Sequence, residues 1–140
     1  MKDLGELNFF LGIEVSKTSN GFYLSQAKYI ADLLAKHNMA DCSPVPTPMS
    51  TGHQLRKGSG STITNASQYR SIIGALQYVT LTRPEIAFSV NKHSQYLSSP
   101  TSEHWEACKR LLRYLKGSIH FGLHFYHFGT LQMNCFSDSD

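Results

Sequence analysis

The N-terminal quarter of the chain alternates apolar and polar residues. Between Phe9 and Ser16 every second side chain on one side is apolar, namely Phe9, Leu11, Ile13 and Val15. A period of two is typical of a half-buried strand. Asn20-Gly21 favours a tight turn because both residues tolerate positive φ, and Phe22-Tyr23-Leu24 follows as a returning strand. The pattern predicts a β-hairpin over about Asn8 to Ser25, with Gly12 marking a place where another backbone comes close.

Four later segments repeat apolar residues at helical spacing. The first is capped by Ser25 and ends near Asn38. The second runs over about Tyr69 to Leu81, and a weaker third begins with Pro84 at its first position. Thr101 caps the fourth, from about Ser102 to Lys116, whose apolar stripe is Trp105, Cys108, Leu111, Leu112 and Leu115. Such stripes need partners, so we expect a small helical bundle.

The remaining segments are a spacer and a terminal β element. Residues 40–65 carry three prolines and three glycines among serines and threonines, which is typical of a flexible surface linker. After Gly117 the period returns to two, first at Ile119, Phe121, Leu123 and Phe125, then after Gly129 at Leu131, Met133 and Cys135. The expected fold class is α+β, with an N-terminal β-hairpin, a linker, a helical bundle and C-terminal β-strands.

Composition narrows the class of protein. The chain has 140 residues, a mass of 15.7 kDa and 41% apolar residues, which suits one domain or one domain plus a fragment. Its apolar runs are shorter than a bilayer span, and Met1 to Gly5 does not form a signal peptide, so we expect no membrane partner. Cys42, Cys108 and Cys135 lack Cys-x-x-Cys spacing, which favours reduced thiols and a cytoplasmic or nuclear location.

Basic residues concentrate in the C-terminal half. The net charge is +3, and the segment from Ala66 to Gly117 contains seven basic residues and three acidic ones. Four of these cations lie on the last helix, away from its apolar stripe: Lys109, Arg110, Arg113 and Lys116. A run of cations without acids favours binding to the phosphates of a nucleic acid. The alternative is an ordinary solvated helix face.

Other chemical signals are weak taken singly. Asp138 and Asp140 would share one face of a strand and could present carboxylates to Mg²⁺, although two acids at a terminus are usually solvated. His120, His124 and His127 lack a nearby acidic or cysteine ligand. Cys108 lies on an apolar stripe, as a core residue does. The sequence carries none of the common nucleophile, P-loop, zinc or dinucleotide motifs, so no self-contained active site is visible.

Several blocks, in order, resemble copia-type retrotransposon polyproteins. They cover nearly the whole chain: M-K-D-L-G-E-L-N-F-F-L-G-I-E-V (Met1 to Val15), L-S-Q-x-K-Y, P-V-P-T-P-M, Y-R-S-I-I-G-A-L-Q-Y, T-R-P-E-I-A and K-R-L-L-R-Y-L-K-G (Lys109 to Gly117). These are similar to consecutive parts of the reverse transcriptase region. F-S-D-S-D, from Phe136 to Asp140, resembles the first strand of the ribonuclease H domain that follows.

The resemblance implies a division of the chain and roles for its residues. Residues 1–39 would be the end of the palm and the first thumb helix, 40–65 a linker, 66–117 a thumb-like bundle, and 118–140 the connection and the start of ribonuclease H. The stretch matching the primer grip includes Phe10, Leu11 and Gly12. Asp138 matches the first catalytic, metal-binding carboxylate of ribonuclease H, and Asp140 belongs to the same Asp-x-Asp pattern, both acting with Mg²⁺ in the full-length family.

The resemblance also implies what the chain lacks. The family's polymerase aspartates, in a Tyr-x-Asp-Asp hairpin, would lie before Met1, and the remaining ribonuclease H acids beyond Asp140. Because two-metal chemistry needs several converging carboxylates, we expect the isolated chain to need no cofactor and to catalyse neither reaction. Its expected partners are the rest of the Pol polyprotein and, weakly and without sequence preference, RNA/DNA or DNA duplexes. The alternative is an inactive relic that binds no nucleic acid.

Overall fold

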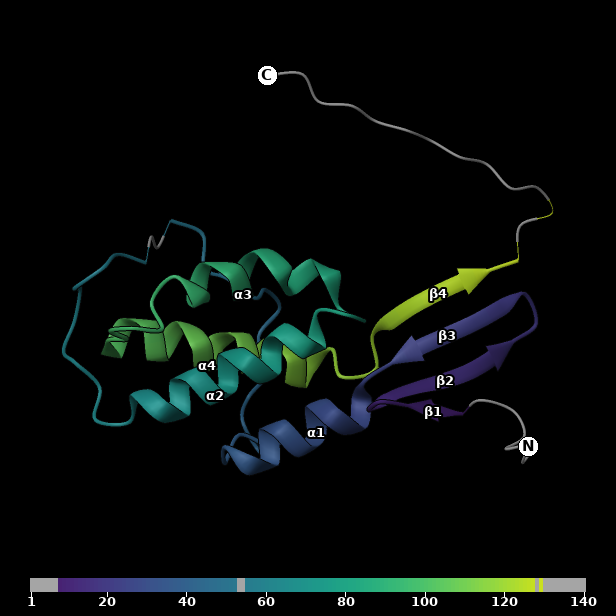
Figure 1. Cartoon of the computed structure of the whole chain (residues 1–140), viewed down its shortest axis with the longest axis horizontal. Coiled ribbons are helices and arrows are strands. Elements are labelled where there is room, and N and C mark those ends of the chain that lie inside the picture. The colour runs from purple at the N-terminus through teal and green to yellow at the C-terminus, as the bar shows by residue number, and fades with distance from the viewer. Residues whose placement is uncertain (1–7, 53–54, 128, 130–140) are drawn as a thin grey trace, which may run out of the picture.

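A four-stranded antiparallel sheet lies beside one end of a helical bundle in the computed structural model, which describes residues 8–52, 55–127 and 129 (Figure 1). The sheet has the order β1 (Phe9–Phe10), β2 (Ile13–Thr18), β3 (Gly21–Ser25) and β4 (Gly122–Tyr126). The bundle consists of α1 (Ala27–Lys36), α2 (Ala66–Val79), a 3₁₀ turn η1 (Pro84–Ile86), α3 (Ala87–Ser94) and α4 (Ser102–Gly117). The α+β class is confirmed.

The β2–β3 hairpin is confirmed, but its tip lies one residue earlier than the sequence suggested. Thr18 pairs with Gly21, so the turn residues are Ser19 and Asn20. Gly21 is the first residue of β3, at φ 152°. A Cβ on Gly21 would lie 1.7 Å from the carbonyl oxygen of Phe125. Glycine is required here by the close approach of β4, not by the hairpin turn.

The first predicted strand is two strands. Phe10 pairs with Ile13, so β1 folds back onto β2 through a turn made of Leu11 and Gly12. Both residues have left-handed backbones, with φ 49° at Leu11 and φ 83° at Gly12. Two successive positive φ angles give the tight turn whose twist matches that of paired strands. The prediction of one continuous strand was wrong because a two-residue turn leaves the alternation of apolar and polar residues unchanged, so the pattern does not show the turn.

The C-terminal strand joins the N-terminal hairpin. β4 pairs antiparallel with β3, and Phe22 is opposite Phe125. The sequence predicted a separate two-stranded element at the C-terminal end, but β4 instead completes a sheet with residues about one hundred positions earlier. The second predicted strand, around Met133, lies outside the described residues.

The helices share one apolar core, and the helical predictions are confirmed. The buried side chains that form it are Ile30, Leu33, Leu34, Tyr69, Ile72, Ile73, Leu76, Val79, Ile86, Val90, Cys108, Leu111, Leu112 and Leu115. α1 therefore packs in the same core as the later helices. Thr101 begins α4 in a capping box with His104, as expected in part. Ser25 ends β3 and donates to Glu14 Oε2 at 3.0 Å, so it does not cap α1.

The proline-rich and glycine-rich segment is not the free linker that its composition indicated. Its described residues, 40–52 and 55–65, form no helix or long strand, but they are attached to the bundle at several points. The hydroxyl of Tyr96 donates to the Leu55 carbonyl at 2.7 Å, and Ser102 N donates to the Ser61 carbonyl at 2.8 Å. Leu55 itself is buried. Backbone carbonyls, which carry no sequence signal, make most of these attachments.

None of the helices in the described ranges has the length and the apolar character to cross a membrane.

Candidate nucleic-acid interface

The turn between β1 and β2 lies at the end of the sheet that is next to the bundle (Figure 1). Phe9, Phe10 and Leu11 are exposed, Leu11 to 73%. Behind the turn, a Cβ on Gly12 would lie 3.3 Å from the hydroxyl of Tyr78, so α2 supports the backbone at this point. Tyr78 in turn meets Tyr29 of α1 edge to face, with ring centroids 5.0 Å apart. Phe10, Leu11 and Gly12 therefore lie together, at an exposed turn with a fixed backbone.

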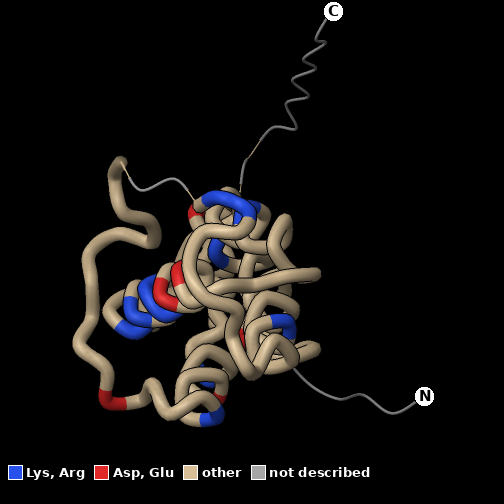
Figure 2. The backbone as a smooth tube through the Cα atoms, turned by 90° about the vertical axis from the view of Figure 1, so that its left-hand side faces the viewer, with Lys and Arg blue, Asp and Glu red and all other residues tan. Residues whose placement is uncertain are grey.

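The four predicted cations of α4 lie on one face but have different surroundings. All four are half-buried. Lys109 Nζ pairs with Glu106 Oε1 at 2.5 Å, one turn earlier on the helix. The side chain of Lys116 makes no hydrogen bond or ion pair with the described residues. Acidic and basic residues are interleaved at this end of the molecule (Figure 2). The face is therefore mixed in charge, although the segment from Ala107 to Gly117 contains no acid.

Arg110 and Arg113 hold residues 43–49, which we call the strap. Arg113 Nε donates to the Ser43 carbonyl at 2.7 Å, and Val45 N donates to the Arg113 carbonyl at 3.4 Å. Arg110 Nη2 donates to Thr47 Oγ1 at 2.7 Å. Each guanidinium uses one of its five N–H donors in these bonds and keeps its charge. Sequence reasoning missed the strap; the extended Pro44, Pro46 and Pro48 were its only signal.

A hollow of about 390 Å³ separates part of the strap from α4. Its wall combines apolar atoms of Pro48, Met49 and Leu55 with charged groups of the helix. Those charged residues are Glu103, Glu106, Arg110 and Arg113. Glu103 accepts a hydrogen bond from Ser59 at 2.6 Å, and Arg110 Nε is buried with no hydrogen-bond partner in the described part of the chain. The strap therefore contacts α4 at Ser43, Val45 and Thr47, and the hollow lies beyond these contacts, at Pro48 and Met49.

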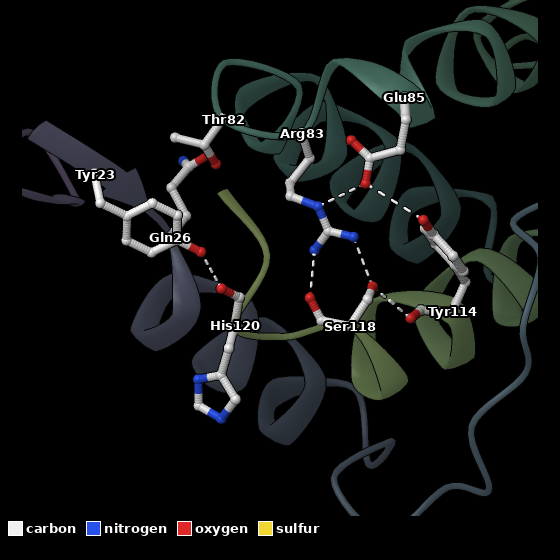
Figure 3. Close-up of polar contacts among 8 residues, drawn as sticks. All are labelled: Tyr23, Gln26, Thr82, Arg83, Glu85, Tyr114, Ser118 and His120. Carbon is white, nitrogen blue, oxygen red and sulfur yellow. Dashed lines mark hydrogen bonds and ion pairs between the residues drawn. The ribbon is translucent and has the colours of Figure 1, made fainter. Parts of the chain in front are cut away.

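Arg83 lies at the junction of bundle and sheet and is only 1% exposed (Figure 3). Its Nε pairs with Glu85 Oε1 at 2.7 Å, and its two terminal nitrogens donate to Ser118. Its guanidinium carbon lies 5.4 Å from the ring centroid of Phe121 and 5.7 Å from that of Tyr114. A cation at the end of α4 also complements the helix dipole. From the sequence, Arg83 was only one of the seven basic residues between Ala66 and Gly117, and no pattern indicated that it is buried at this junction.

Two further residues, Gln26 and Tyr23, connect the sheet to other parts of the molecule. Gln26, between β3 and α1, accepts a hydrogen bond from Thr82 Oγ1 at 2.8 Å and donates to the Tyr78 carbonyl at 3.4 Å. Tyr23 of β3 donates its hydroxyl to the His120 carbonyl, just before β4 (Figure 3). Together with Arg83, these contacts fix the sheet, and hence the Leu11–Gly12 turn, relative to α4.

In the described part of the chain, His124 packs against aromatic rings, and His93 and His104 are buried in the bundle. His124 lies 4.6 Å from Tyr23 and 5.7 Å from Tyr126, measured between ring centroids. Burial lowers the pKa of His93 to about 4 and lowers that of His104 below its ordinary value. Within the described ranges no three His, Cys, Asp or Glu residues are placed to hold a metal ion. Asp138 and Asp140 lie outside these ranges, so their predicted metal site is not part of this description.

Comparison with known proteins places the chain in a family. The family model described as reverse transcriptase (RNA-dependent DNA polymerase) matches residues 1–51. No solved structure matches the chain.

Over its whole length the chain is 45% identical to the Retrovirus-related Pol polyprotein from transposon RE1 and 43% identical to that from transposon RE2, both of Arabidopsis thaliana. The corresponding polyprotein from transposon TNT 1-94 of Nicotiana tabacum is 39% identical over 84% of the chain. The chain spans 10% of the length of each of these relatives. The resemblance read from the motifs is confirmed, and the chain belongs to the family of retrotransposon Pol polyproteins, within their reverse transcriptase region.

Proposed function

We propose that the chain supplies the surface of a retrotransposon reverse transcriptase that grips the template-primer duplex. The observation that carries the proposal is the exposed Leu11–Gly12 turn, which lies within the residues matched by the reverse transcriptase family and at the block similar to a primer grip. A backbone held in a left-handed turn keeps its amide groups in fixed directions. Such a turn suits contact with the terminal nucleotide of a primer strand.

The cations of α4 are the second half of the proposed surface. Phosphates need positive charge at fixed positions and carry no base information, so contacts of this kind position a duplex without selecting its sequence. Lys109 and Lys116 lie on the face of α4 that also carries the two arginines. The strap occupies one donor of each arginine, and both guanidinium groups keep the positive charge that would attract phosphates. The bundle from α1 to α4 would then act as the thumb of the enzyme.

On this proposal the chain grips the duplex while other parts of the polyprotein carry out the chemistry. Two-metal phosphoryl transfer needs several carboxylates converging on both Mg²⁺ ions. The 140 residues contain no Tyr-x-Asp-Asp sequence. We therefore expect no nucleotide incorporation on a primed template and no ribonuclease H cleavage by the chain alone, with Mg²⁺ or Mn²⁺. Incorporation that persists through further purification would contradict this assignment.

Duplex binding as a function of salt tests the proposal. Binding to short DNA and RNA/DNA duplexes should be weak, with Kd of about 10⁻⁴ to 10⁻⁶ M at physiological salt, and independent of sequence. Four phosphate contacts predict a slope of log K against log salt of about −3.6. Replacing Lys109 and Lys116 together by Gln should flatten the slope by about two units while leaving the strap attached.

The matched control replaces Lys36 by Gln, because this exposed cation lies at the end of α1 and not on α4. Its slope should equal that of the unmodified chain. Equal slopes for the control and the Lys109, Lys116 variant would show that the α4 cations are only a solvated face. Absence of duplex binding by the folded chain would favour the alternative, an inactive retroelement relic.

A further inference from the structure

The strap runs along α4 in the direction opposite to that of the helix. Pro44 lies against Gly117, the last residue of α4, where an added Cβ would be 2.9 Å from the Pro44 Cβ. About one turn earlier in α4, Arg113 is bonded to the strap through both its guanidinium group and its backbone carbonyl. Thr47 then accepts from Arg110, about one turn earlier again. The strap therefore follows positions 110, 113 and 117, which share one face of the helix.

This row of positions overlaps the basic row of α4. Lys109, Arg113 and Lys116 are spaced i, i+4 and i+7, so they also share a face, and Arg113 belongs to both rows. The strap takes the Nε donor of Arg113 and an Nη2 donor of Arg110, and both side chains are half-buried. A phosphate oxygen that accepted from these same donors would displace the strap.

The chemistry of the strap allows such an exchange. Its two acceptors, the Ser43 carbonyl and the Thr47 hydroxyl, are neutral, and residues 43–49 include no charged side chain. A phosphate carries negative charge and can accept two hydrogen bonds from one guanidinium group, which makes it the stronger partner for an arginine. The three prolines restrict the strap to extended conformations even when it is detached, so closing it again costs little conformational entropy.

We propose that the strap is an autoinhibitory cover on α4, which occupies Arg110 and Arg113 in the free chain and is displaced by the phosphates of a bound duplex. This inference rests on the proposed function, because it assumes that the α4 cations bind phosphates. A closed strap lowers the affinity for the duplex without changing the phosphate contacts in the complex. By linkage, the duplex opens the strap by the same factor as the closed strap weakens duplex binding.

Two variants that loosen the strap without altering the charge of the chain test the inference. Thr47→Val removes the acceptor of Arg110, and Gly117→Ala places a methyl group against the Pro44 ring. Each should tighten binding to a short labelled DNA duplex by about twofold to tenfold, the effect of one hydrogen bond that no longer has to be broken. The slope of log K against log salt should not change, because the number of phosphate contacts stays the same.

The matched controls carry the same substitutions away from the strap. Thr51→Val is at an exposed position beyond it, and a Cβ on Gly74 in α2 meets nothing within 4 Å, so Gly74→Ala is the second control. Both should bind the duplex as the unmodified chain does, and circular dichroism checks that every variant is folded. In the unmodified chain, saturating duplex should also speed hydrogen exchange of the Val45 amide, which donates to the Arg113 carbonyl.

The outcomes separate this inference from the proposed function. A folded strap variant that binds the duplex no tighter than its control would overturn the autoinhibitory cover, while a salt slope that still depends on Lys109 and Lys116 would leave the proposed function standing. Slower exchange of Val45 in the complex would make the strap part of the duplex-binding surface and would also overturn the cover. Absence of duplex binding by the unmodified chain and by both strap variants would overturn the two proposals together.

Discussion

Arg83 donates two hydrogen bonds to one residue, Ser118, at 2.8 Å to the carbonyl oxygen and 2.6 Å to Oγ. Ser118 directly follows α4, and Arg83 lies between α2 and η1. The pair therefore fixes the point at which the chain leaves the bundle to form β4. Because β4 pairs with β3, this contact helps to set the position of the whole sheet.

We expect Arg83→Gln to destabilise the fold by about 3 kcal/mol, because it removes the charged hydrogen bonds that a buried guanidinium makes to Ser118 and Glu85. Arg83→Lys should not restore stability, since an ammonium group cannot bond both oxygens and Glu85 in the same geometry. Urea unfolding followed by circular dichroism measures the effect. Lys36→Gln, at an exposed site, should change stability by less than about 0.5 kcal/mol. Stabilities that match for Arg83→Gln and Lys36→Gln would show that the junction contributes nothing.

Gly21→Ala should detach β4 from the sheet, because the added Cβ would lie 1.7 Å from the Phe125 carbonyl oxygen. Hydrogen exchange of residues 122–126 should become much faster, while the helices stay protected. Gly74→Ala is the opposite case, since a Cβ in that part of α2 meets nothing within 4 Å. It should stabilise the helix by about 0.5 to 1 kcal/mol. Unchanged exchange in Gly21→Ala would contradict the β3–β4 pairing.

Stability should fall as the pH falls from 6.5 towards 4. Burial lowers the pKa of His93 to about 4 and also lowers that of His104, whose Nδ1 accepts a hydrogen bond from Thr101 N at 3.0 Å. The unfolded chain therefore binds more protons than the folded chain in this window, and each buried histidine contributes a slope of at most about 1.4 kcal/mol per pH unit.

The measurement is urea unfolding at several pH values between 4 and 7. His93→Gln should have a shallower dependence on pH than the unmodified chain, whereas His124→Gln, on an exposed strand residue, should keep the original slope. An unaltered slope in His93→Gln would mean that His93 is not held neutral by burial.

Thr47→Val should loosen the strap, because it removes the acceptor of Arg110 Nη2 while keeping the shape of the side chain. We expect a loss of about 1 kcal/mol at this contact and faster hydrogen exchange over residues 43–49. Thr51→Val, at an exposed position beyond the strap, is the control and should leave exchange unchanged. If both variants exchange alike, the strap is held by its backbone contacts to Arg113 alone.

Local patterns predicted the helices well and the turns poorly. The stripe from Trp105 to Leu115 defines α4 because burial on one helix face requires a period near 3.6. The turn at Leu11 and Gly12 interrupts an alternating run without changing its period, so periodicity could not locate it. Gly21 was assigned to a turn because glycine suits turns, whereas its role is to admit the backbone of β4.

The candidate site also has features that the sequence predicts and features that only the tertiary structure shows. The basic character of α4 follows from residue type and spacing, whereas the exposure of the apolar residues around Leu11 does not. That Arg110 and Arg113 hold the strap depends on a carbonyl at Ser43 and a hydroxyl at Thr47, more than sixty positions away. A backbone carbonyl is present at every residue, so no sequence pattern indicates which carbonyl will accept a hydrogen bond from an arginine.

The sequence by itself determined the helices, the α+β class and the family, because side-chain periods and motif blocks are local properties of the chain. Tertiary structure decided that β4 completes the N-terminal sheet, that Arg83 is buried at the junction, and that the strap lies along α4. These features depend on contacts between residues far apart in sequence. Their energies come from burial and from hydrogen bonds that exist only once both partners have been brought together.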